Sequence, residues 1–110
     1  MTRFASVILD ADSTLAAIEG IDWLAVRRGG EVAERVAALT DEAMSGRTPL
    51  ESVYARRLEL IAPTAVELEE LGRAYIGAAD PDAAGALARL RETGVALHVV
   101  SGGLRPALLP

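Results

Sequence analysis

Two aspartates stand two positions apart near the N-terminus, directly after a short apolar run. Asp10 and Asp12 follow Phe4–Leu9, whose apolar and β-branched residues are typical of a parallel strand covered on both faces. Ligands of open α/β sheets bind at the carboxyl ends of strands, and residues i and i+2 of an extended chain point to one side. One carboxylate can then attack phosphorus while the other acts as general acid and base. Hard carboxylate oxygens also suit a Mg²⁺ ion that neutralises a phosphate.

A second group with phosphate-binding character ends another apolar run. Ser101, Gly102 and Gly103 follow Val95–Val100, which also predicts a buried strand. A hydroxyl and glycine amides at a strand end can form a small anion cradle, although the same residues also make an ordinary strand-to-helix turn. The pairing of an acidic loop after one strand with this cradle after the next favours a phosphate site.

The strand at Val95–Val100 is preceded by a predicted helix. Asp80 is the expected N-cap of this helix, which runs to Thr93, and Gly94 is its expected stop. A helix, a tight glycine turn and a buried strand make half of a βαβ unit. His98 lies inside the second strand, where a core position is the expectation.

The segment between the two strands shows only helical signals. Residues 20–77 carry apolar side chains at three- and four-residue spacing. Capping boxes are predicted to begin at Thr48 and at Thr64, each followed three positions later by a glutamate. A helical block inserted after the first strand is typical of a cap over the site that the strand presents.

These elements predict an α/β fold. Residues 1–18 and 78–110 would form a Rossmann-like parallel-sheet core, and residues 19–77 a helical cap inserted after the first strand. Two parallel strands do not make a stable sheet covered on both sides, so the core is expected to be incomplete and the chain to be truncated at Pro110.

Composition excludes several other classes of protein. The chain has 110 residues, of which 51% are hydrophobic and 25% charged, as in folded globular proteins. The net charge of −5 and the absence of any basic cluster larger than an arginine pair argue against nucleic-acid binding. Without cysteine there is no disulfide, thiolate metal site or cysteine nucleophile. The N-terminal apolar run is too short for a membrane span, so a soluble cytoplasmic protein is expected.

The motifs resemble those of the haloacid dehalogenase superfamily. Asp10–Leu15 is similar to its first motif, and Val99–Gly103 is similar to its second. Within the superfamily, the segments Glu19–Asp22, Ala43–Gly46 and Leu50–Arg57 resemble the phosphoserine phosphatase family. The resemblance covers nearly the whole chain, and it is specific because the helical cap occurs where that family has it.

The resemblance implies a magnesium-dependent hydrolase that cleaves a phosphomonoester through an aspartyl-phosphate. The implied substrate is O-phosphoserine, and the implied setting is serine biosynthesis. Asp10 would be the nucleophile and a Mg²⁺ ligand through its carboxylate. Asp12 would be the general acid and base and would offer its backbone carbonyl to Mg²⁺.

The resemblance also implies four residues that hold the substrate. Glu19 would bind the substrate's amino group, Arg57 its carboxylate, and Ser101 and Gly102 the transferring phosphoryl group. Electrostatics agrees with the first two roles, since an acid suits an ammonium and an arginine fork suits a carboxylate. Arg56 remains an alternative to Arg57, because adjacent helix positions face different ways.

Two features of the superfamily have no counterpart in this sequence. The chain contains no lysine to balance charge around the aspartyl-phosphate, and no acidic motif follows Ser101. Mg²⁺ demands near-octahedral oxygen geometry, so Asp10 and Asp12 alone should bind it weakly. The 110-residue piece alone is therefore expected to release no more phosphate from phosphoserine than an Asp10→Asn control does.

Three alternatives to this function can be compared with the sequence. The substrate could be another small phosphomonoester, such as a phosphorylated amino alcohol or homoserine. A substrate that lacks the amino-acid head would not need both Glu19 and Arg57. A phospho-accepting receiver module of this length would alternate short strands and helices, which the helical block contradicts. A decayed, non-catalytic scaffold would have lost Asp10 or Asp12, and both are present.

Overall fold

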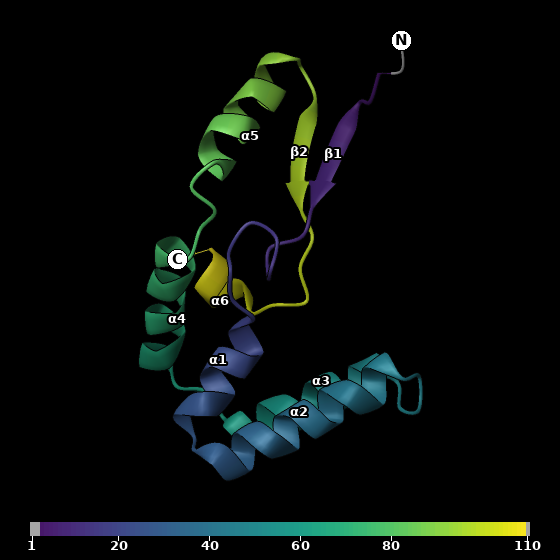
Figure 1. Cartoon of the computed structure of the whole chain (residues 1–110), viewed down its shortest axis with the longest axis vertical. Coiled ribbons are helices and arrows are strands. Elements are labelled where there is room, and N and C mark those ends of the chain that lie inside the picture. The colour runs from purple at the N-terminus through teal and green to yellow at the C-terminus, as the bar shows by residue number, and fades with distance from the viewer. Residues whose placement is uncertain (1–2, 110) are drawn as a thin grey trace.

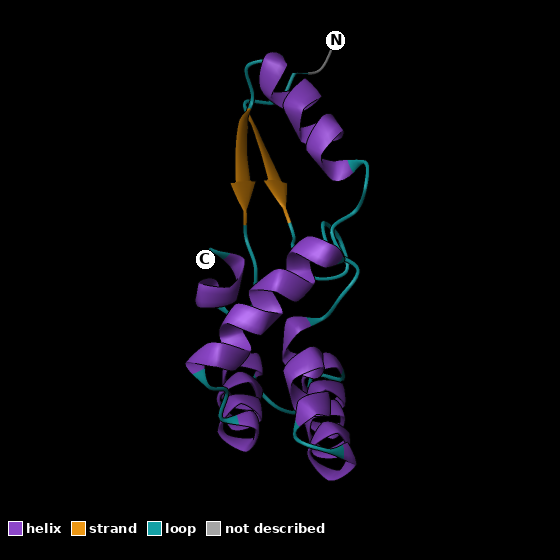
Figure 2. Ribbon diagram, turned by 90° about the vertical axis from the view of Figure 1, so that its left-hand side faces the viewer, coloured by secondary structure: helices purple, strands orange, loops and turns teal. Residues whose placement is uncertain are grey.

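The chain folds into a two-stranded sheet at one end and a group of packed helices at the other. The structure, a computed structural model, describes residues 3–109. In chain order its elements are β1 (Ser6–Leu9), α1 (Gly20–Arg27), α2 (Gly30–Met44), α3 (Leu50–Ile61), α4 (Ala65–Gly77), α5 (Ala83–Glu92), β2 (Ala96–Val99) and α6 (Arg105–Leu108). The strands point with their carboxyl ends toward α1 and α6, and α2 and α3 lie furthest from the sheet (Figures 1 and 2).

The two strands are parallel, as predicted. β1 pairs with β2 in a register that places Ser6 opposite Ala96 and Leu9 opposite Val99. Four helices, α1 to α4, separate β1 from α5 and β2. The predicted α/β class, with a helical block inserted after the first strand, is confirmed.

The expectation that both faces of the sheet are buried is wrong for the described chain. Ile8 is 68% exposed, Val99 is 56% exposed, and His98 is exposed rather than a core residue. The strands are exposed because too few helices of the described chain cover the sheet. Among residues 3–109 only α5 packs against the sheet, so one helix covers only part of one face.

The helix boundaries correct two other predictions. Helix α3 begins at Leu50, and no capping box forms, because Pro49 and not Thr48 is its N-cap. The Thr48 hydroxyl donates to Glu42 Oε2 at 3.1 Å. Helix α5 begins at Ala83, not directly after Asp80, because the Asp80 carboxylate accepts from the amide of Asp82 at 2.8 Å and forms a separate turn.

Two predicted helix signals are confirmed. The Thr64 hydroxyl accepts from the amide of Glu67 at 3.2 Å, and the Glu67 carboxylate accepts from the amide of Thr64 at 3.1 Å, which is a complete capping box at the start of α4. Gly94 follows α5 with φ +86°, a conformation that favours glycine and stops the helix.

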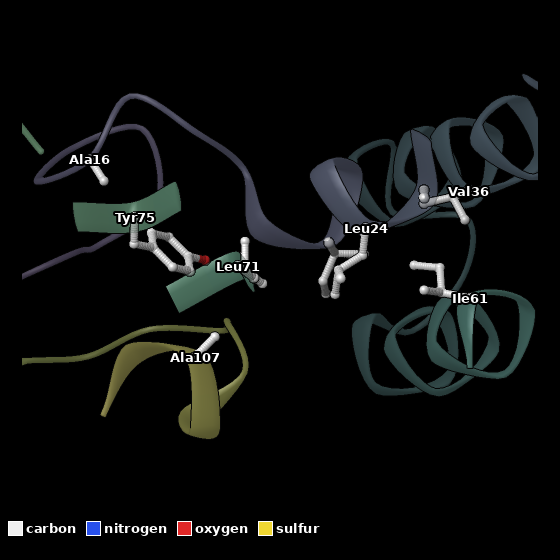
Figure 3. Close-up of a cluster of buried hydrophobic side chains, with 9 residues drawn as sticks. Ala16, Leu24, Val36, Ile61, Leu71, Tyr75 and Ala107 are labelled. Atoms are coloured by element: carbon white, nitrogen blue, oxygen red, sulfur yellow. The ribbon is translucent and has the colours of Figure 1, made fainter. Parts of the chain in front are cut away.

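The hydrophobic core lies among the helices rather than under the sheet. Leu24 of α1, Val36 of α2, Ile61 of α3 and Leu71 of α4 have no exposed surface, and Figure 3 shows Leu24 between Leu71 on one side and the α2–α3 pair on the other. Ala107 of α6 is packed against the same cluster. No helix within residues 3–109 is long and apolar enough to cross a membrane.

An ion pair fixes the junction of three helices. Arg28, directly after α1, donates to both carboxylate oxygens of Glu67 at 2.6 and 2.5 Å. The same guanidinium donates to the carbonyls of Ile61 at 2.7 Å and Ala62 at 3.2 Å, which end α3 and lack helical partners. Arg28 thereby joins the C-terminal ends of α1 and α3 to the first turn of α4.

This junction predicts a pH-dependent stability. The hydrogen bonds from Arg28, together with the amide and hydroxyl of Thr64, lower the pKa of the Glu67 carboxyl from 4.5 to about 2 despite its burial. A carboxyl with a lower pKa in the folded state adds stability above its unfolded pKa and loses it as pH falls between those two values. Urea unfolding midpoints should therefore drop in that acid range, and Glu67→Gln should flatten the drop.

Glu69→Gln on the exposed side of α4 is the matched control for the Glu67 prediction. It removes the same charge from the same helix without touching Arg28. If the Glu67→Gln and Glu69→Gln proteins lose stability equally between neutral and acid pH, the junction does not carry the effect.

Candidate active site

A cavity of about 470 Å³ opens between the strand ends and helices α1, α2 and α3. It brings together all six residues that the sequence singled out for chemistry or binding. They are Asp10, Asp12, Glu19, Arg57, Ser101 and Gly102. Of the two adjacent arginines, Arg57 lines this cavity and Arg56 is exposed on α3 elsewhere.

Asp10 occupies the first position of a tight loop after β1. Its Oδ1 accepts from the amide of Ala11 at 2.9 Å, and its Oδ2 accepts from the hydroxyl of Thr14 at 3.4 Å. The carbonyl of Ala11 in turn accepts from the amides of Thr14, Leu15 and Ala16. Asp10 itself is exposed, so its carboxylate is oriented by the loop while remaining accessible from the cavity.

Asp12 is more enclosed than Asp10 and is bound on both carboxylate oxygens. Its Oδ1 accepts from the hydroxyl of Tyr75 at 2.8 Å, and its Oδ2 accepts from the amide of Gly20 at 2.8 Å. Burial, followed by the hydrogen bond to Asp12, raises the pKa of the Tyr75 hydroxyl well above its ordinary value. Tyr75 therefore stays protonated and serves Asp12 as a hydrogen-bond donor.

Glu19 stands just before α1, at the edge of the cavity. Its Oε1 accepts from the hydroxyl of Ser13 at 2.8 Å, and Ser13 has a positive φ of +57° that turns the loop toward Glu19. The glutamate is exposed, so its charge can meet a ligand in the cavity without a large desolvation cost.

Arg57 approaches the cavity from α3, opposite the acidic loop. Its Nη1 donates to the hydroxyl of Thr40 on α2 at 3.2 Å, and that hydroxyl donates to the carbonyl of Val36 at 3.1 Å. The Nε of Arg57 is buried and has no partner among the described residues. A buried, unpaired N–H is costly, so this geometry favours an acceptor supplied by a ligand.

Ser101 and the glycines after it form the wall next to Asp12. The Ser101 hydroxyl oxygen accepts from the amide of Gly103 at 2.9 Å. A Cβ on Gly103 would lie 3.1 Å from that oxygen and 3.4 Å from Asp12 Oδ1, so the loop and the acid are close neighbours. Glycine permits this approach, as an anion cradle requires.

The oxygen donors in the cavity suit Mg²⁺ in kind. Residues 3–109 contain no group of three or more histidine, cysteine, aspartate or glutamate side chains placed to hold a metal ion. Mg²⁺ in enzymes commonly takes one or two carboxylates and completes its shell with water and substrate phosphate. The exposed Asp10 carboxylate fits that pattern.

Sequence reasoning missed two residues that support this cavity. Tyr75 and Thr40 each hold a predicted site residue through a side-chain hydrogen bond, Tyr75 to Asp12 and Thr40 to Arg57. Both lie on amphipathic helices, where a tyrosine on the apolar face or a threonine is usually interpreted as an ordinary packing residue. The sequence carries no local signal for either contact.

Comparison with known proteins agrees with the motifs. No family model matches the chain. The chain is similar to the phosphoserine phosphatase of Bos taurus, with 34% identity over 91% of this chain and 44% of that protein. It is also similar to the phosphoserine phosphatase of Halobacterium salinarum, with 36% identity over 93% of this chain and 47% of that protein.

A solved structure shows the same fold. A phosphoserine phosphohydrolase-like protein from Francisella tularensis matches with a TM-score of 0.83 and 21% identity, over 97% of this chain and 51% of that one. The chain therefore spans about half the length, or less, of the proteins it matches. The resemblance to phosphoserine phosphatases predicted from the motifs is confirmed.

Proposed function

We propose that this chain carries the nucleophile, the general acid and base, and the substrate-recognition residues of a phosphoserine phosphatase. The observation that carries the proposal is the single cavity in which the acidic loop after β1, the Ser101 loop after β2 and the cap residue Arg57 face one another. Residues 19–77 would serve as the cap over the strand ends. Similarity to phosphoserine phosphatases from animals and archaea supports the same assignment.

The reaction would proceed in two steps on Asp10. In the first, an Asp10 carboxylate oxygen attacks phosphorus, the bond between phosphorus and the serine oxygen breaks, and Asp12 donates a proton to that oxygen. In the second, Asp12 takes a proton from water, which attacks the aspartyl-phosphate, releases inorganic phosphate and restores Asp10. The Ser101 hydroxyl and the Gly102 amide would hold the phosphoryl oxygens during both steps.

Mg²⁺ would be held by the Asp10 carboxylate and the Asp12 backbone carbonyl. When bound, the ion neutralises phosphate charge and so permits approach of an anionic nucleophile. The chain's own residues would orient the reacting groups. The contacts from Ala11 and Thr14 orient Asp10 for attack.

The amino-acid part of the substrate would lie between Glu19 and Arg57. The exposed carboxylate of Glu19 suits the ammonium group, and the unpaired Nε of Arg57 suits the carboxylate. Phosphorylated serine carries both groups, and its hydrolysis yields serine, so the proposed setting is serine biosynthesis.

A chimera tests this function. Because the chain spans about half of its relatives, we would use it to replace the segment of the Halobacterium salinarum phosphoserine phosphatase that it matches. With Mg²⁺ the chimera should release inorganic phosphate from O-phosphoserine, and chelation should stop the release. A folded chimera with no Mg²⁺-dependent release would contradict the proposed function.

A substrate panel on the same chimera separates the alternatives. O-phosphoserine should be preferred over phosphoethanolamine, which lacks the carboxylate for Arg57, and over phosphorylated homoserine, which is longer by one methylene. Equal rates for O-phosphoserine and phosphoethanolamine would show that the cavity serves a different small phosphomonoester.

A further inference from the structure

The Asp12 carboxylate is bound by one side chain, that of Tyr75, to which the proposed reaction gives no role. Tyr75 lies near the end of α4, 63 positions from Asp12, and is only 7% exposed. Its hydroxyl donates to Asp12 Oδ1 at 2.8 Å. We propose that Tyr75 is the positioning residue for Asp12 and that its hydroxyl fixes where Oδ1 lies in the cavity. This inference rests on the proposed function, because it concerns the general acid of that reaction.

The two groups that bind Asp12 differ in what they can do. The amide of Gly20, at 2.8 Å from Oδ2, can only donate, so Oδ2 must remain an acceptor whether or not Asp12 is protonated. The hydroxyl of Tyr75 can donate to an unprotonated Oδ1 and accept from a protonated one. Tyr75 can therefore hold Oδ1 in place in either of these two states of Asp12.

Oδ1 is also the oxygen beside the proposed phosphoryl cradle. It lies 3.4 Å from the position that a Cβ on Gly103 would take, and Gly103 directly follows Ser101 and Gly102. Tyr75 therefore anchors Asp12 with Oδ1 beside the loop that would hold the phosphoryl group.

The position of Tyr75 depends on close packing between α1 and α4. A Cβ on Gly20 would lie 2.2 Å from the Tyr75 hydroxyl oxygen and 3.4 Å from Leu71 Cδ2. The Tyr75 ring belongs to the buried cluster and lies beside Leu71 (Figure 3). A side chain at position 20 would therefore push the hydroxyl away from Asp12, so the orientation of Asp12 depends on how α4 packs against α1.

The first test uses the 110-residue chain and needs no activity. The Gly20 amide resonance in a nitrogen–proton NMR spectrum reports the hydrogen bond to Asp12 Oδ2. Tyr75→Phe should shift this resonance, because the carboxylate loses its second anchor and changes its orientation toward the Gly20 amide. The chain has two tyrosines, and Tyr54→Phe in the cap is the control that should leave it in place. An unchanged Gly20 resonance in Tyr75→Phe would overturn the proposal.

The second test uses the chimera and compares two leaving groups. For O-phosphoserine, Tyr75→Phe should lower the first-turnover rate and kcat about 10-fold with little change in KM, the size expected for one hydrogen bond. Release of p-nitrophenol from p-nitrophenyl phosphate should change far less in the first turnover, because that leaving group departs without a proton. Equal losses on both substrates would mean a structural role and would overturn the proposal.

Gly20→Ala provides a variant that keeps the tyrosine. It should reproduce the selective loss on O-phosphoserine, and the double variant should lose no more than either single one, because both remove the same contact. Additive losses would contradict a shared mechanism. If the chimera hydrolyses neither substrate, the proposed function fails, and the Gly20 resonance still decides whether Tyr75 positions Asp12.

Discussion

Asp10→Asn in the chimera is expected to reduce phosphate release from O-phosphoserine by roughly 10³-fold or more, the scale seen when a catalytic nucleophile is removed. An amide is a poor nucleophile at phosphorus, and the substitution also removes the charged oxygen that would hold Mg²⁺. The shape of the side chain is kept, so the contacts with Ala11 and Thr14 can be largely retained. The loss should therefore come from chemistry rather than from misfolding.

The covalent intermediate gives this prediction a direct readout. Rapid denaturation during turnover should trap phosphate on the unaltered chimera, detectable as an added mass on the peptide that contains Asp10, and should trap none on Asp10→Asn. Asp41→Asn, an exposed carboxylate of α2, is the control and should keep both activity and trapped phosphate. Trapped phosphate on Asp10→Asn would assign the nucleophile to another residue.

The sequence could predict the parts of the site that are local in the chain. Asp10 and Asp12 follow one strand and Ser101 follows the other, so parallel pairing of the strands is enough to bring them together. The parallel pairing itself followed from two apolar runs separated by helical signals. These predictions needed only periodicity and the rule that ligands bind at the carboxyl ends of strands.

Contacts between distant helices could not be predicted in this way. The bond from Tyr75 to Asp12 joins residues 63 positions apart, and the bond from Arg57 to Thr40 joins residues 17 apart, so both depend on how the helices pack. The capping box predicted at Thr48 does not form, because α3 has Pro49 as its N-cap and Thr48 lies one position too early. The prediction that the strands are buried was wrong, because an apolar run shows only that a strand is suited to burial. It does not show which elements cover the strand.

The choice between Arg56 and Arg57 shows what packing adds to a motif. Adjacent helix positions point about 100° apart, so only one of the two arginines can face the strand ends. In the structure Arg57 lines the cavity and bonds to Thr40, while Arg56 is exposed. The pair therefore offers an internal control, since both residues have the same chemistry on the same helix.

Arg57→Met is expected to raise the KM of the chimera for O-phosphoserine about 10- to 100-fold, the range for losing a hydrogen bond to a charged group. Methionine keeps much of the apolar length of arginine but cannot bind a carboxylate. The KM for phosphoethanolamine should change little, because that substrate has no carboxylate to lose. Arg56→Met should leave both substrates unaffected.

The Arg57 result also tests how the guanidinium is held. Thr40→Val removes the hydroxyl that accepts from Nη1 and should raise KM for O-phosphoserine in the same direction but less, since the arginine remains. Arg57→Lys should recover only part of the loss, because an ammonium lacks the planar fork that grips a carboxylate on two sides. Equal KM changes for O-phosphoserine and phosphoethanolamine in Arg57→Met would mean that the arginine shapes the cavity but does not bind the substrate carboxylate.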